Sequence, residues 1–129
     1  MTPVLRAILV AALAALFAQP ATAADDWEKI KSYSVEKKDE AVAYGRKLVR
    51  QTDREIKELD RKASKASGEA KAQFQSDAKE LKAKRREASK KLDEMGKASS
   101  AAWDNAKNGF ADAYRDLHES YEKAAAQFK

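Results

Sequence analysis

The chain has 129 residues, of which 36% are charged, and its 26 Lys and Arg against 21 Asp and Glu give a formal net charge of +5. It contains no cysteine, four glycines and two prolines. This composition excludes disulfides and thiolate metal sites, and it favours long helices over a broad globular core. A chain of this length forms one domain at most.

The first 23 residues have the features of a secretory signal. Arg6 supplies a positive start, an apolar run extends from Ala7 to Ala18, and Ala21-Thr22-Ala23 provides a small-x-small cleavage site. The apolar run is shorter than the stretch of about 20 residues that spans a bilayer. We therefore predict a signal peptide at 1–23 and a mature domain at 24–129. The mature protein is expected to be periplasmic or extracellular, and it has no cysteine to carry a lipid anchor.

Two helix starts follow the predicted cleavage site. Asp25 or Asp26 can cap a short helical lead over 26–33, and Ser34 is the expected N-cap of a long helix over 34–66. Apolar or small residues recur at heptad positions along the longer helix, which is the pattern of a coiled coil. Because many of these residues are small, helices can approach closely there but bury little area. They are Val42, Gly45, Val49, Thr52, Ile56, Leu59, Ala63, Ala66 and Ala70.

The clearest break in the mature chain is at Ser67-Gly68, because glycine readily adopts the left-handed conformation that reverses a chain. Beyond it the heptad seam resumes and continues without interruption from Phe74 to Ala113. This continuity favours an all-α antiparallel hairpin of long helices, with 34–66 packed against 69–128. The alternative is a bend near 96–100, at Gly96 and the small residues after it, which gives a three-helix up-down-up bundle.

The last quarter of the chain, 103–128, carries a stripe of large apolar residues at helical spacing, which we call the aromatic stripe. It consists of Trp103, Phe110, Tyr114, Leu117, Tyr121 and Phe128. Such a stripe is most often the core of a bundle or a homo-oligomer, and the alternatives are a protein-binding face and a lipid-adsorbing face. The polar side of this segment is slightly acidic, which opposes simple adsorption to anionic membranes. We therefore predict that these residues bind a second copy or another protein.

A basic row precedes this segment. Lys82, Arg86 and Lys90 are spaced four residues apart on one helix face, and we predict that they contact an anionic surface. The alternative is an ordinary solvated face, because acidic residues are interleaved with the basic ones. Arg85 is different, since it falls on the seam, and its head group is expected to reach solvent or an acid such as Asp53 or Glu55.

The sequence offers little for catalysis. Its single histidine, His118, precedes Glu122 by four residues, but a metal site normally needs three or four ligands and no others are evident. There is no cysteine, and no serine lies in a nucleophile-elbow motif. We expect a non-enzymatic protein without metal or cofactor, in which His118 is a polar neighbour of the stripe residue Leu117.

Four segments together resemble a loose group of small exported bacterial coiled-coil proteins of unassigned function. They are 34–44, the Lys-Ala-Ser-Gly turn at 65–68, 82–86 and 102–117, the last of which begins Ala102-Trp-Asp-Asn. The long amphipathic helices also resemble those of apolipoproteins and desiccation protectants. The resemblance implies an all-α, non-enzymatic protein and assigns no site residue. We expect a self-associating envelope structural factor or a chaperone-like protein-binding factor. Binding to lipid or a membrane surface is the alternative, and nucleic acid is not an expected partner of an exported protein.

Overall fold

The computed structural model describes residues 22–128, with side chains from Asp25 onward, and every regular element in that range is helical. The predicted all-α fold is therefore confirmed. The predicted signal peptide lies outside the described residues, apart from its last two positions. The elements are α2 (Thr22–Ser32), the 3-10 turn η1 (Val35–Lys37), α3 (Lys38–Ser64), α4 (Gly68–Lys97), α5 (Trp103–Ala125) and the 3-10 turn η2 (Ala126–Phe128).

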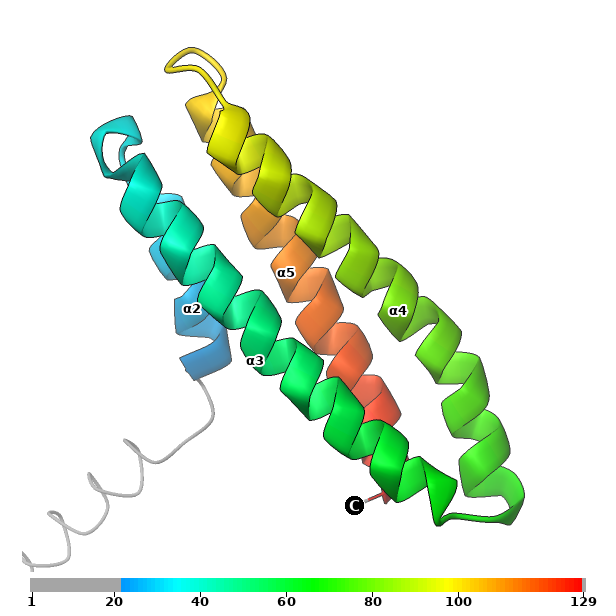
Figure 1. Ribbon diagram of the computed structural model, residues 1–129. Coiled ribbons are helices and arrows are strands. Elements are labelled where there is room, and N and C mark those ends of the chain that lie inside the picture. The colour runs from blue at the N-terminus through cyan, green and yellow to red at the C-terminus, as the bar shows by residue number, and fades with distance from the viewer. Residues whose placement is uncertain (1–21, 129) are drawn as a thin grey trace, which may run out of the picture.

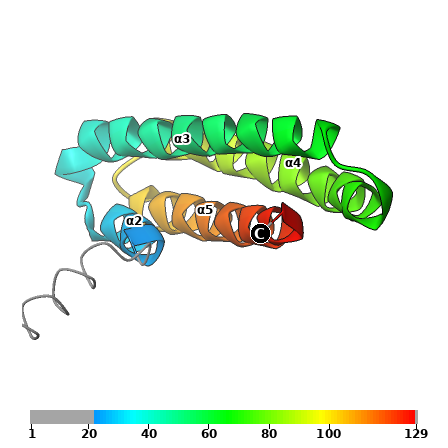
Figure 2. The same ribbon diagram turned by 90° about the horizontal axis from the view of Figure 1, so that it is seen from below.

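The three long helices alternate in direction, with α4 antiparallel to α3 and to α5, and the short helix α2 packs beside them (Figure 1). α3 and α4 lie next to each other, and α5 and α2 lie on the opposite side of the bundle (Figure 2). α5 packs along the whole of α4 and also contacts α2, so it is the central element of the core. One continuous cluster of buried apolar side chains joins all four helices.

The preferred prediction of one long helix over 69–128 is wrong. α4 ends at Lys97, and Ala98 takes an extended conformation with φ −68° and ψ 139°. A tight turn follows, in which the Ala102 amide donates to the Ser99 carbonyl at 3.1 Å, and α5 begins at Trp103. The Lys38 ammonium donates to the Ala98 carbonyl at 2.8 Å and so satisfies an end carbonyl of α4. The predicted alternative, a three-helix bundle with a bend near 96–100, is the one the structure adopts.

The start of the first long helix also differs from the prediction. Ser34 precedes the 3-10 turn η1 and makes no side-chain capping hydrogen bond, and α3 begins only at Lys38. The short lead is a regular helix from Thr22 to Ser32, which is longer than the predicted 26–33. The reversal at Ser67-Gly68 is confirmed, and Gly68 adopts a φ of 69°.

α3 packs closely against α4 and α5 at Gly45. A Cβ atom added there would lie 2.7 Å from Leu92 Cδ1 on α4 and 3.0 Å from Phe110 Cε2 on α5. Real Cβ atoms do not make contacts this short without displacing their neighbours. The small residues of the α3 seam therefore allow the bundle to close around the aromatic rings of α5.

Substitution of Gly45 tests this close packing. Gly45→Ala gains about 1 kcal/mol of helix propensity but must displace Leu92 and Phe110. Gly109→Ala is the control, because its new methyl group would meet only Lys91 Cδ, at an ordinary 3.7 Å. In urea denaturation we expect Gly109→Ala to be more stable than wild type, and Gly45→Ala to be less stable than Gly109→Ala by about 1–3 kcal/mol. Equal stabilisation by both substitutions would refute tight packing at Gly45.

Candidate functional site

Most of the aromatic stripe lies inside the bundle. Trp103 is 2% exposed, Tyr114 is 5% exposed, and Phe110 and Leu117 are fully buried. Only Tyr121 and Phe128 are partly buried and so retain some exposed surface. The apolar surface that the sequence predicts for a partner is thus largely covered by the chain's own α2, α3 and α4.

The start of α5 is held by α2 and the residue that follows it. The Tyr33 carbonyl accepts hydrogen bonds from Trp103 Nε1 at 3.0 Å and from Lys107 Nζ at 2.8 Å. Tyr44 Oη on α3 donates to Asp26 Oδ1 at 2.5 Å, and burial together with this bond raises the pKa of Tyr44. These contacts fasten α2 over the aromatic rings. Sequence reasoning missed them because the partners are far apart in the chain and the acceptor at Tyr33 is a backbone carbonyl.

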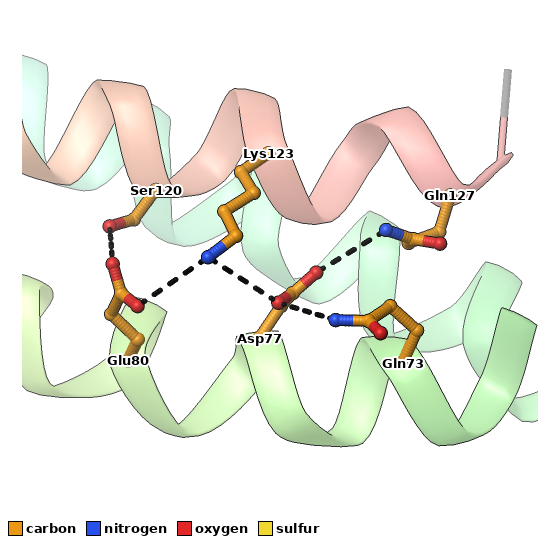
Figure 3. A network of polar contacts seen from close by, with 6 residues as sticks. All are labelled: Gln73, Asp77, Glu80, Ser120, Lys123 and Gln127. Atoms are coloured by element: carbon orange, nitrogen blue, oxygen red, sulfur yellow. Dashed lines mark hydrogen bonds and ion pairs between the residues drawn. The ribbon is translucent and has the colours of Figure 1, made fainter.

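The end of α5 is fastened to α4 by a polar network around the buried Asp77, which is 5% exposed. Its carboxylate accepts hydrogen bonds from Gln73 Nε2 at 3.1 Å and from Gln127 Nε2 at 3.4 Å, and Lys123 Nζ lies 3.9 Å away. The described part of the chain contains no buried side-chain nitrogen or oxygen without a partner. The network is therefore complete within the chain and requires no ligand. Its members are Gln73, Asp77, Glu80, Ser120, Lys123 and Gln127 (Figure 3).

Arg85 forms the predicted ion pair with Asp53. Its Nε and Nη2 atoms each donate to one carboxylate oxygen at 2.8 Å, so the pair is bidentate and joins α4 to α3. The hydrogen bond from Arg85 holds the pKa of Asp53 below its ordinary value, although partial burial opposes this shift. The seam arginine therefore acts as a crosslink between the two helices and is not available to a ligand.

His118 lies beside the core as a polar neighbour of α2 and α3. Its Nε2 atom is 3.7 Å from Glu122 Oε1, and its ring centroid is 5.9 Å from that of Trp27. The pKa of the nearby Glu55 is raised, mainly by burial and further by Glu122, whereas His118 lowers it. Within residues 22–128 no group of three or more His, Cys, Asp or Glu side chains is arranged to hold a metal ion. His118 thus has neighbours that account for its position without a metal.

The predicted basic row remains at the surface. Lys82, Arg86 and Lys90 are all exposed, and no ion pair reaches them from the described residues. Two of the four acids interleaved with them in sequence are engaged elsewhere: Glu80 accepts a hydrogen bond from Ser120 of α5, and Glu94 pairs with Lys91. The other two, Glu87 and Asp93, are exposed beside the row.

The structure extends this row onto α3. A shallow hollow between the two helices is lined by Lys57 of α3 and Lys82 of α4 together with the Asp53–Arg85 pair. Arg50 and Arg46 precede Lys57 by two and three helical turns and so lie on the same side of α3. We define the α3–α4 face by its exposed cations, which are Arg46, Arg50, Lys57, Lys79, Lys82, Arg86 and Lys90.

Cations outnumber acids on the α3–α4 face. Asp39 and Asp93 share its helical positions, and Asp53 is engaged by Arg85. Acids of α5 are matched by cations, since Asp112 pairs with Lys31 and Arg115, and Asp104 pairs with Lys107. The α3–α4 face is therefore the side on which exposed cations lie without ion pairs to the described residues. The sequence alone identified only the α4 cations of this face, because the register of α3 against α4 is determined by the fold.

Comparison of the chain with protein-family models, curated proteins and solved structures finds no match. None of the described helices combines the length and the hydropathy needed to cross a membrane. The α3–α4 face is the candidate functional site because of the exposed cations that α3 and α4 place on it.

The Asp53–Arg85 pair leads to a pH-dependent prediction. Because the pKa of Asp53 is lowered in the folded state, the pair stabilises the fold above the ordinary carboxyl value of 3.8 and loses this effect as the pH falls through the folded value. We expect Asp53→Asn to lower the free energy of unfolding at pH 7 by about 0.5–1 kcal/mol. The substitution should have little effect at an acidic pH at which the Asp53 carboxyl is protonated in both the folded and the unfolded chain. Urea denaturation at pH 7 and at that acidic pH measures the difference. Asp60→Asn is the control, and an equal loss with it would contradict the assigned role of the pair.

Proposed function

We propose that this protein is a non-enzymatic, exported helical bundle that binds a polyanionic partner through the α3–α4 face. The observation that supports the proposal is the gathering of exposed cations from two helices on one side, without ion pairs to the described residues. Surface cations are usually interspersed with acids, and a face of one sign attracts molecules of opposite charge.

The burial of the aromatic stripe also supports binding through the α3–α4 face. If Trp103, Phe110 and Leu117 bound a partner directly, the bundle would have to open and expose its largest core residues. Each of these side chains contributes about 1.5–3 kcal/mol to folding when buried, so opening would be costly. Binding through the charged exterior leaves the core intact, and we therefore assign the primary partner surface to the α3–α4 face.

The proposal predicts binding that depends on salt. An exposed cation near an anionic surface contributes about 1 kcal/mol, and physiological salt screens such charges beyond about 8 Å. Several cations acting together are thus needed for useful affinity. Binding should weaken steeply as salt is added, while the fold is preserved.

Retention on immobilised heparin, used as a generic polyanion, tests the α3–α4 face. We expect the triple variant Lys82→Gln, Arg86→Gln, Lys90→Gln to elute at markedly lower salt than wild type. The charge-matched control is Lys47→Gln, Lys62→Gln, Lys65→Gln, which removes three exposed lysines that are not among the cations of this face. The control should elute close to wild type. Equal loss of retention in both variants would show that net charge, and not the face, causes binding and would refute the proposal.

A second candidate function is self-association through the end of the aromatic stripe. It is supported by the partial exposure of Tyr121 and Phe128, and the Phe128 ring lies 5.6 Å from that of Phe74 at the end of the bundle. A protein–protein contact there would cover the remaining apolar surface without opening the core. A mass that rises with concentration in light scattering, and falls back to that of a monomer in Tyr121→Ser, would support this candidate.

A further inference from the structure

We infer that the partner of the α3–α4 face is the surface of an anionic phospholipid bilayer, which the protein binds at the level of the headgroups with its bundle closed. This inference rests on the proposed function, namely that the face binds anions. It adds the class of partner and the manner of contact.

The shape of the face suits an extended flat surface. α3 has 27 residues and α4 has 30, and at 1.5 Å per residue they provide two adjacent rods about 40 Å long. The cations extend over about 17 Å of each rod, from Arg46 to Lys57 on α3 and from Lys79 to Lys90 on α4. A compact anion such as free phosphate would require cations that converge on one point. A headgroup layer offers negative charges spread over a plane, as the face requires.

The face has no large apolar side chain to insert into the hydrocarbon layer. Val49 and Ile56 on α3 and Leu81 and Leu92 on α4 are buried in the core. The tryptophans are engaged within the bundle, since Trp103 is buried and Trp27 of α2 packs against Tyr114 and His118 of α5. Contact with a bilayer is thus electrostatic, unlike the adsorption of an amphipathic helix, which buries apolar residues.

The arrangement of the helices determines how the bundle lies on the membrane. α5 and α2 lie on the side of the bundle opposite to α3 and α4 (Figure 2). The exposed cations of α3 and α4 attract an anionic surface, whereas Lys31, Lys107 and Arg115 on the other side are engaged in ion pairs with acids of α5. The protein therefore binds with α3 and α4 toward the headgroups. In that orientation Tyr121 of α5 is not part of the contact with the headgroups.

Co-sedimentation of the mature protein (24–129) with vesicles tests the inference. Wild type should bind vesicles containing phosphatidylglycerol and not vesicles of phosphatidylcholine alone, and salt should release it. At about 1 kcal/mol per cation, the triple variant at Lys82, Arg86 and Lys90 should lose at least tenfold in partitioning, whereas the control at Lys47, Lys62 and Lys65 should stay within about twofold of wild type. Circular dichroism confirms that both variants are folded and that binding leaves helicity unchanged.

The outcomes separate failure of the inference from failure of the proposed function. Retention on heparin without binding to phosphatidylglycerol vesicles would overturn the membrane partner and leave a polyanion-binding face. Tighter binding to a duplex oligonucleotide than to vesicles would overturn it in favour of nucleic acid. Binding that resists salt and shifts tryptophan emission to shorter wavelength would show apolar insertion and overturn the headgroup-level contact. Binding to neither heparin nor vesicles would overturn both.

Discussion

The packing of the aromatic stripe of α5 between the other helices is the interaction on which the rest of this structure depends. Trp103, Phe110 and Leu117 are almost completely buried, and they supply the large side chains that the seam of α3 lacks. Gly45 admits the Phe110 ring, and α2 covers the rings from the other side through Trp27. Since burial of each such residue contributes about 1.5–3 kcal/mol, a bundle without α5 would retain only a thin core.

The sequence predicted the helical faces correctly but did not determine how they connect. A heptad seam that continues in phase past Gly96 is equally compatible with a straight helix and with a chain that reverses there. Periodicity shows which side of a helix is apolar, and it does not show where the helix ends. The reversal is stabilised by the bonds from Lys38 to Ala98 and from Trp103 to Tyr33, between residues distant in sequence. The pair of Arg85 and Asp53 was predictable, because a seam arginine requires a nearby acid in the facing helix.

Part of the functional site could also be predicted from the sequence. The row of Lys82, Arg86 and Lys90 follows from helical spacing within one segment, and the structure keeps it exposed. Its continuation through Arg50 and Lys57 depends on the register of α3 against α4, which no local pattern specifies. Burial of the aromatic residues shifts the expected mode of recognition from apolar contact to charge. Tyr121 and Phe128 are the stripe residues that keep partial exposure.

The most direct test of the central claim is the helicity and cooperativity of a mature chain that ends at Ser100, compared with residues 24–129. If α5 supplies the core, the shortened chain loses its large buried residues, and far-ultraviolet circular dichroism should show a marked loss of helix and no cooperative thermal transition. The full mature chain should unfold in one transition. A shortened chain that kept the helicity of α3 and α4 and unfolded cooperatively would contradict the account, because the hairpin would then be stable without the aromatic stripe.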